Sequence, residues 1–182
     1  MRKGVLLKFV VITVFLFQLP QGCGSNGSFV LTSTAFTNNS NIPAKFSCDG
    51  QNISPPLQWE GAPSNTLSFA LVLHDPDAPL SGGFTHWVIY DIPSGVKSLD
   101  ENLPKTALLA NGATQGNNGS NALGYTGPCP PAGKAHHYNF TLYALDIVFN
   151  LRSGISQNQL ETTMKGHILA QTRLTGLYQR AS

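Results

Sequence analysis

The run Leu67–Leu73 is the segment that most restricts how this 182-residue chain can fold. Successive side chains of a β-strand point to opposite faces of its sheet. In this run one face would carry three leucines and a phenylalanine, and the other would carry serine, alanine and valine. A strand that is apolar on both faces is typical of the interior of a sheet that is covered on both sides. The run therefore predicts a central strand.

Further strand signals dominate the chain from Ser28 onward. Short runs of apolar, aromatic and β-branched residues are bounded by Gly, Pro, Asn and Asp, which is typical of strands joined by turns. They cover Phe29–Thr32, Trp87–Ile92, Tyr138–Leu145 and about Arg173–Tyr178. A chain of this length favours one core. We therefore expect a mainly β fold.

Only one segment has a helical pattern. Ser156 followed by Gln159 matches a capping box, in which the side chain of each residue accepts a hydrogen bond from the backbone N–H of the other. Apolar residues then recur every four positions, at Leu160, Met164 and Ile168. This spacing predicts a helix that packs one face against the core.

The first residues indicate an export signal that precedes the domain. Residues 1–4 form a basic head, and an apolar run from Phe9 to Phe17 follows, which is the order typical of a secretory signal peptide. Even when it is extended over residues 5–19, the run is shorter than the roughly 20 residues that a membrane-spanning helix needs. We therefore expect residues 1–22 to be a signal peptide, residues 23–28 a short tether and residues 29–182 the domain.

The processing of this leader stays open between two alternatives. Gly22 followed by Cys23 resembles a lipoprotein box, although Pro20 stands where leucine is usual. Lipidation of Cys23 would hold the protein at a membrane, and we expect no other membrane contact. Ordinary signal cleavage would leave it periplasmic or secreted.

The charge of the mature chain argues against a nucleic-acid partner. Removal of residues 1–22 takes away Arg2, Lys3 and Lys8, which leaves eight Lys and Arg against nine Asp and Glu, a net charge of −1. Binding to nucleic acid would need a clustered basic surface. We therefore expect no nucleic acid among the partners.

Two cysteines remain if Cys23 is acylated or lost with the leader. Cys48 and Cys129 could form one disulfide in an oxidising compartment, or they could be two separate buried thiols. Sequence does not fix their geometry. Both alternatives are open at this stage.

The segment from Asn111 to Lys134 is the most unusual part of the chain. It holds six glycines, four asparagines and three prolines, with almost no apolar periodicity. Loops of this length without secondary structure are uncommon in compact domains and are usually functional or disordered. Because the segment leads directly into the strong strand signal at Tyr138–Leu145, we expect an ordered, functional loop.

Three polar clusters lie where predicted strands begin or end. They cover Asp75–Pro79, Gly82–Trp87 and Gly124–Tyr138. Their pattern is aspartate-proline-aspartate-x-proline, then glycine-x-x-histidine-tryptophan, then a glycine-tyrosine-x-glycine-proline-x-proline-proline loop. The last cluster ends in a histidine-x-tyrosine strand start. A rigid sheet can hold such loop residues in place.

In this order the clusters resemble the phosphatidylethanolamine-binding protein family. The segments Cys48–Gly50, Ser54–Trp59 and Phe140–Asp146 are similar to its bacterial branch, which is often labelled Raf-kinase-inhibitor-like. The resemblance covers about Phe29 to Tyr178. It implies an antiparallel β-sandwich-like single domain with a few short helices.

The resemblance also implies a ligand-binding pocket. Its residues here would be Asp75, Pro79, His86, Pro130, Pro131, His136 and Tyr138, with Cys129 in the same loop. Imidazole and phenol groups can donate hydrogen bonds to phosphate or carboxylate oxygens. An aspartate cannot attract an anion, so we expect Asp75 to accept a hydrogen bond from a histidine and to fix the tautomer of that ring. His137 departs from the family pattern, because arginine is more usual there.

The leading hypothesis is an exported, non-enzymatic binding protein for a small anionic ligand or a phospholipid head group. Inhibition of a secreted protease, or another interaction with a protein partner, is the alternative, and a homodimer is left open. A metal-dependent enzyme is the third hypothesis. It is disfavoured because His136 and His137 should point to opposite faces of a strand and so could not both bind one ion. We therefore expect no cofactor and no metal.

Overall fold

The computed structural model describes Met1 and residues 27–180 of the chain. The predicted signal peptide and the lipidation site Cys23 lie outside this described part. The elements follow in the order β1 Val30–Thr32, β2 Ser40–Asn41, the 3-10 turn η1 Ala44–Phe46, β3 Leu57–Glu60, β4 Ser68–Asp75, β5 Phe84–Pro93, β6 Ser98–Leu99, β7 Thr114–Gln115, β8 His136–Leu145, α1 Gln157–Met164 and β9 Ile168–Tyr178.

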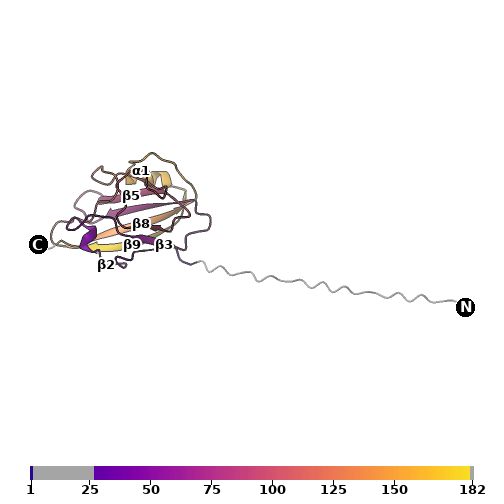
Figure 1. Ribbon diagram of the computed structural model, residues 1–182, viewed down its shortest axis with the longest axis horizontal. Coiled ribbons are helices and arrows are strands. Elements are labelled where there is room, and N and C mark those ends of the chain that lie inside the picture. The colour runs from indigo at the N-terminus through magenta and orange to yellow at the C-terminus, as the bar shows by residue number, and fades with distance from the viewer. Residues whose placement is uncertain (2–26, 181–182) are drawn as a thin grey trace.

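Two sheets build the domain (Figure 1). The larger has six strands in the order β2-β9-β8-β4-β5-β7, and the smaller has three in the order β1-β3-β6. Neighbouring strands are antiparallel except β2 and β9, which run parallel. This arrangement confirms the predicted β-sandwich-like fold.

Strand β4 is the central strand that the sequence predicts, because it pairs with β5 on one side and β8 on the other. Its Phe69 and Leu71 belong to the core that also holds Trp59 of the smaller sheet. On the opposite face Val72 belongs to a second cluster, which includes Leu160 of α1. Both faces are therefore covered, which explains why the run is mostly apolar. Leu67, the first residue of the predicted run, lies outside β4 and is 54% exposed.

Helix α1 begins with the predicted capping box. The Ser156 hydroxyl accepts from the Gln159 amide, and the Gln159 side chain accepts from the Ser156 amide. The expectation that Ile168 continues the helical stripe is wrong, since Ile168 is the first residue of β9 and is 43% exposed. Gly166, with a φ of +85°, lies between the two elements in a conformation that favours glycine.

The two ends of the larger sheet differ. Strand β4 ends, and β5 and β8 begin, at the same end, because the three strands are antiparallel neighbours. The chain enters the domain at the other end, where the ring centroid of Phe29 lies 6.1 Å from that of Phe69, the second residue of β4. These two ends are separated by the length of β4, and eight residues of a strand span roughly 25 Å.

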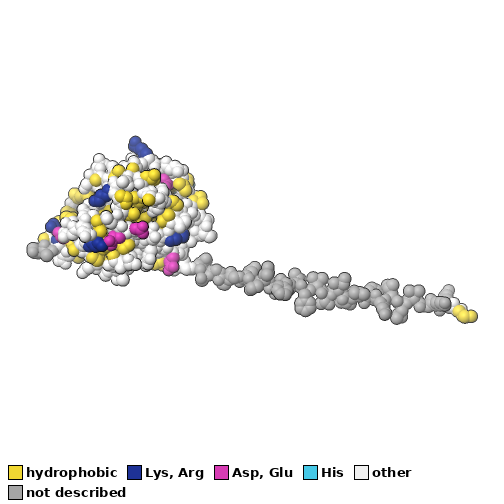
Figure 2. Space-filling model, in the orientation of Figure 1, with side chains coloured by type: hydrophobic (Ala, Val, Ile, Leu, Met, Phe, Trp, Pro, Cys, Tyr) yellow, Lys and Arg dark blue, Asp and Glu magenta, His cyan; other side chains and the backbone are white. Residues whose placement is uncertain are grey.

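The face of the molecule that Figure 2 draws carries no clustered basic surface. On the face drawn in Figure 2, Lys and Arg side chains are scattered and lie among Asp and Glu side chains. Within residues 27–180, no helix combines the length and the apolar composition needed to cross a bilayer.

Candidate functional site

The pairing of three strands brings the three polar clusters together. Asp75 is the last residue of β4, and it pairs with Phe84, the first residue of β5. His136 is the first residue of β8, the other neighbour of β4. The end of one strand is therefore flanked by the starts of two others, and the side chains converge there.

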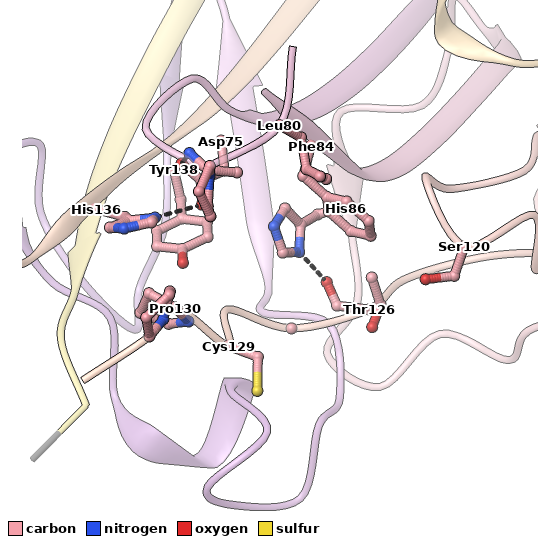
Figure 3. Close-up of a pocket in the computed structure, with 14 residues that line it drawn as sticks. Asp75, Leu80, Phe84, His86, Ser120, Thr126, Cys129, Pro130, His136 and Tyr138 are labelled. Atoms are coloured by element: carbon pink, nitrogen blue, oxygen red, sulfur yellow. Dashed lines mark hydrogen bonds and ion pairs between the residues drawn. The ribbon is translucent and has the colours of Figure 1, made fainter. Parts of the chain in front are cut away.

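A cavity of about 420 Å³ opens at this end of the sheet. All eight residues that the sequence predicts for ligand binding line it (Figure 3). The structure adds six residues: Ala78, Leu80, Phe84, Ser120, Thr126 and Gly127.

Asp75 lies at the base of one wall and is almost fully buried. Its Oδ1 accepts hydrogen bonds from the backbone amides of Asp77 and Ala78, at 2.8 and 3.1 Å. Its Oδ2 accepts from Nδ1 of His136 at 2.8 Å (Figure 3). These three bonds occupy the carboxylate, and the bond to Nδ1 orients the His136 ring, which is the role expected for Asp75.

His86 has a different partner. Its Nδ1 lies 2.8 Å from the carbonyl oxygen of Thr126, while the Thr126 amide donates to the carbonyl oxygen of His86 at 2.9 Å. A carbonyl can only accept, so Nδ1 carries the proton. Burial lowers the pKa of His86 below its usual value, and the carbonyl of Thr126 and the charge of Asp75 only partly oppose this effect.

This geometry limits what the His86 ring can donate to a ligand. A neutral His86 has already used its single N–H on Thr126. The free nitrogen, Nε2, is then a hydrogen-bond acceptor.

The hydroxyl of Tyr138 is the most unusual polar group of the cavity. The side chain is fully buried, and the hydroxyl makes no hydrogen bond of ordinary geometry in the described part of the chain, although the Asp75 carboxylate lies near it. In Figure 3 it points into the space between Pro130 and His86. Burial, with a further contribution from the charge of Asp75, raises the pKa of Tyr138 well above its usual value. The hydroxyl therefore stays neutral and can donate.

Aromatic edges fix the position of the His86 ring. Its centroid lies 4.8 Å from that of Phe84 and 5.2 Å from that of Tyr138, and both contacts are edge-on. Phe84 in turn lies against the backbone of Gly119, where a Cβ atom would come within 2.6 Å of the ring. A side chain at position 119 would therefore displace the wall that supports His86.

The second half of the Gly-rich loop is tied to the segment around η1. The Tyr125 hydroxyl donates to the carbonyl oxygen of Phe46 at 2.6 Å, and the Gly127 amide donates to Oδ1 of Asn52 at 2.7 Å. Cys48 and Cys129 form a disulfide, with their Cα atoms 5.4 Å apart. These contacts hold residues 125–131 as one rim of the cavity.

The first half of the loop is also more structured than the sequence predicts. Thr114 and Gln115 form β7, which pairs with β5. Farther along, Oδ1 of Asn118 accepts from the amides of Ser120 and Ala122, at 3.0 and 3.2 Å. The absence of apolar periodicity conceals this order, because it is built from side-chain contacts to the backbone.

His137 lies outside the cavity, on the exposed face of β8. Its backbone amide and its Nδ1 both contact Oδ2 of Asp77, each at 2.7 Å. His136 and His137 thus point to opposite sides, as predicted. Among residues 27–180, no group of three or more His, Cys, Asp or Glu side chains is placed to hold a metal ion.

Of the six lining residues that the predicted set lacks, most lie inside the sequence clusters. Phe84, Thr126 and Gly127 belong to these motifs, and Ala78 and Leu80 lie beside Pro79. Ser120 has no motif of its own. It reaches the cavity because the loop turns at Asn118, and this contact could not be found from spacing.

Comparison with known proteins decides the family. The family model described as phosphatidylethanolamine-binding protein matches residues 32–179. The chain belongs to this family. The match covers almost all of the predicted domain.

Relatives and solved structures of the family agree with this assignment. A UPF0098 protein of Methanothermobacter thermautotrophicus is 49% identical over 150 residues, which are 82% of this chain and 98% of the relative. A phosphatidylethanolamine-binding protein homologue from Chlamydia trachomatis has a TM-score of 0.76 at 39% identity and covers 84% of this chain and 97% of its own. YbcL of Escherichia coli has a TM-score of 0.78 at 32% identity, with 85% and 99% covered.

Proposed function

We propose that this protein is an exported, non-enzymatic binding protein whose pocket takes a small anionic group. The group would be a phosphate or carboxylate of a lipid head group, a small molecule or a protein partner. The observation that carries the proposal is the buried Tyr138 hydroxyl, which has no partner within residues 27–180 and points into the cavity. An unpaired buried donor costs free energy that a bound oxygen atom would recover.

The size and the chemistry of the cavity support a small group. A volume of about 420 Å³ lies near the lower end of the roughly 300–1,000 Å³ that is typical of small-molecule pockets. His136, when protonated, would donate through Nε2, because its Nδ1 is bonded to Asp75. The tyrosine and this histidine would then contact different oxygen atoms of one anion.

The hydrogen bonds of the two pocket histidines favour binding over catalysis. Nucleophilic catalysis requires a base within hydrogen-bond reach of a hydroxyl or thiol. The Asp75 carboxylate and the Thr126 carbonyl occupy Nδ1 of His136 and of His86, and within the described part of the chain no hydroxyl or thiol forms a hydrogen bond with Nε2 of either ring. Neither histidine is thus paired with a nucleophile.

Inhibition of a secreted protease is the alternative function that the sequence suggests. A carboxypeptidase Y inhibitor in complex with its proteinase has a TM-score of 0.51 at 18% identity. At this identity the likeness concerns the fold alone, and it does not favour this candidate. We keep the small anion as the ligand and leave a protein partner or a homodimer to experiment.

Export is supported by the leader pattern and by the disulfide, because disulfides form and persist mainly in oxidising compartments. The chain enters the domain at the end opposite the cavity. A lipid on Cys23 would therefore leave the cavity open to solvent. N-terminal sequencing and mass spectrometry of the envelope protein test this, and an intact Met1 would contradict it.

Titration calorimetry tests the binding proposal. Inorganic phosphate and phosphoethanolamine should bind to the purified domain, and ethanolamine alone should not. Native mass spectrometry of freshly isolated protein would show a retained ligand. The absence of binding by every phosphate and carboxylate tested would overturn the proposal.

A further inference from the structure

The tautomer of His86 bears on which anions the pocket can bind. The proton on Nδ1 is fixed by the carbonyl oxygen of Thr126, 2.8 Å away. The same two residues are also joined through the amide of Thr126 and the carbonyl oxygen of His86. Because the carbonyl belongs to a loop held by the disulfide and by Tyr125, it cannot easily turn away from the ring.

The other ring nitrogen faces the cavity. In Figure 3, Nε2 of His86 points away from Thr126 and toward the side where Tyr138 lies. No hydrogen bond to Nε2 is formed within residues 27–180. The charged or titratable groups that act on this ring are Asp75, which favours its protonation, and His74, which opposes it. Burial outweighs both, so the ring is neutral near pH 8.

A neutral Nε2 accepts a hydrogen bond and cannot donate one. An anion oxygen without a proton would place its lone pairs against the lone pair of this nitrogen. An oxygen that carries a proton would donate to it. Tyr138, on the other side of the cavity, offers a donor for an oxygen without a proton.

We propose that the pocket selects tetrahedral anions that carry a proton, such as hydrogen phosphate or a monoprotonated phosphomonoester, and that His86 is the residue that determines this specificity. The inference rests on the proposed anion-binding function and deepens it. Sulfate has the same shape as phosphate but has no proton to donate at neutral pH. A site that is built to accept a hydrogen bond discriminates strongly against an analogue that lacks the donor.

The test compares inorganic phosphate with sulfate by titration calorimetry at pH 8. Most phosphate is then hydrogen phosphate, which has the same charge and shape as sulfate and differs by the proton. We expect phosphate to bind at least about tenfold more tightly. Equal affinities, or tighter binding of sulfate, would overturn the inference and leave the proposed function intact. Binding of neither anion would overturn both.

Variants place the discrimination on His86. In His86→Ala the ratio of phosphate to sulfate affinity should fall to about twofold or less, because the acceptor Nε2 of His86 is lost. His137→Ala, on the exposed face of the same end of the sheet, is the matched control and should keep the wild-type ratio. An unchanged ratio in His86→Ala would contradict the assignment.

A measurement on the unaltered protein covers the case in which His86→Ala does not fold. Nitrogen-15 NMR distinguishes a protonated from an unprotonated ring nitrogen. We expect Nδ1 of His86 to be protonated and Nε2 to be unprotonated at pH 8, with a change at Nε2 when phosphate is added but not when sulfate is added. A proton on Nε2 in the free protein would overturn the inference.

Discussion

Asp75 and His136 are joined by a hydrogen bond of 2.8 Å between the carboxylate Oδ2 and the imidazole Nδ1, although 61 residues separate them in the sequence. Their side chains are only 4% and 11% exposed. The bond links the end of β4 to the start of β8. It therefore sets both the orientation of a pocket histidine and the position of the loop that follows β4.

Asp75→Asn should destabilise the domain by about 1–3 kcal/mol. An asparagine offers one oxygen, whereas Asp75 accepts three hydrogen bonds with two. The NH₂ group of the asparagine side chain, which can only donate, would face either the backbone N–H groups of Asp77 and Ala78 or the N–H of the His136 ring. Urea unfolding measures the loss. An asparagine oxygen that faces the two backbone amides keeps two hydrogen bonds, so its NH₂ group should face His136, and nitrogen-15 NMR should then show the proton of His136 on Nε2.

Asp77→Asn is the control for this change. Asp77 is much more exposed, and its contacts to His137 lie at the surface. We expect a loss of less than about 1 kcal/mol, as is usual for exposed pairs. An equal loss in both variants would mean that the buried position of Asp75 has no special energetic role.

His136→Ala should weaken the binding of a phosphomonoester by roughly tenfold or more at pH 5.5. The reason is the loss of a hydrogen bond between the anion and the His136 ring, which Asp75 holds in place. Calorimetry measures the affinity, and circular dichroism checks the fold. His137→Ala should bind as the wild type does, and a similar loss in both variants would place the site elsewhere.

Acid should remove a part of the stability that depends on His86. Its pKa in the folded state is lowered by burial, whereas the unfolded state takes up a proton near the ordinary value of 6.5. The contribution is therefore complete above about pH 6.5 and is lost as the pH falls toward the pKa of the folded state. The slope can reach about 1.4 kcal/mol per pH unit.

Urea unfolding between pH 5 and pH 8 measures this dependence. His86→Gln should show a shallower fall in the free energy of unfolding toward pH 5 than the wild type. His167→Gln is the control, because His167 is exposed and paired with Asp146. A wild-type slope in His86→Gln would exclude His86 as the source.

Removal of the disulfide should cost about 2–4 kcal/mol, because the bridge joins residues 81 positions apart and restricts the unfolded chain. The double variant Cys48→Ser with Cys129→Ser tests this by urea unfolding. A reductant should lower the stability of the wild type and leave the variant unchanged. Free labelling of both thiols in the native protein would show that the bridge does not form.

Gly127→Ala should destabilise the pocket rim by about 1–3 kcal/mol through overpacking. A Cβ atom there would lie 2.3 Å from the carbonyl oxygen of Phe46 and 2.9 Å from Oδ1 of Asn52. Anion affinity should fall as well, because Thr126 and Cys129 belong to the same rim. Gly95→Ala, where nothing lies within 4 Å, should change stability by less than about 0.5 kcal/mol.

The sequence by itself determined strands β1, β4, β5, β8 and β9 and the capping box, and its resemblance to the family implied the residues of the pocket wall. The strands and the cap follow from local rules, such as the apolar run of β4 and the reciprocal hydrogen bonds of Ser156 and Gln159, and the resemblance rests on motifs placed at strand ends. Strand ends that neighbour one another in a sheet bring their motifs together. For this reason all eight predicted residues line one cavity.

Only the tertiary structure decided what each group in the cavity can do. Whether His86 donates or accepts depends on the carbonyl of Thr126, 40 residues away, and the unpaired state of the Tyr138 hydroxyl depends on everything packed around it. The position of Ser120 at the cavity and the order of the loop 111–134 likewise come from side chains that form hydrogen bonds with irregular backbone or with backbone far away in the sequence. Protonation, tautomer and burial are properties of a three-dimensional environment, and residue types and spacing do not specify that environment.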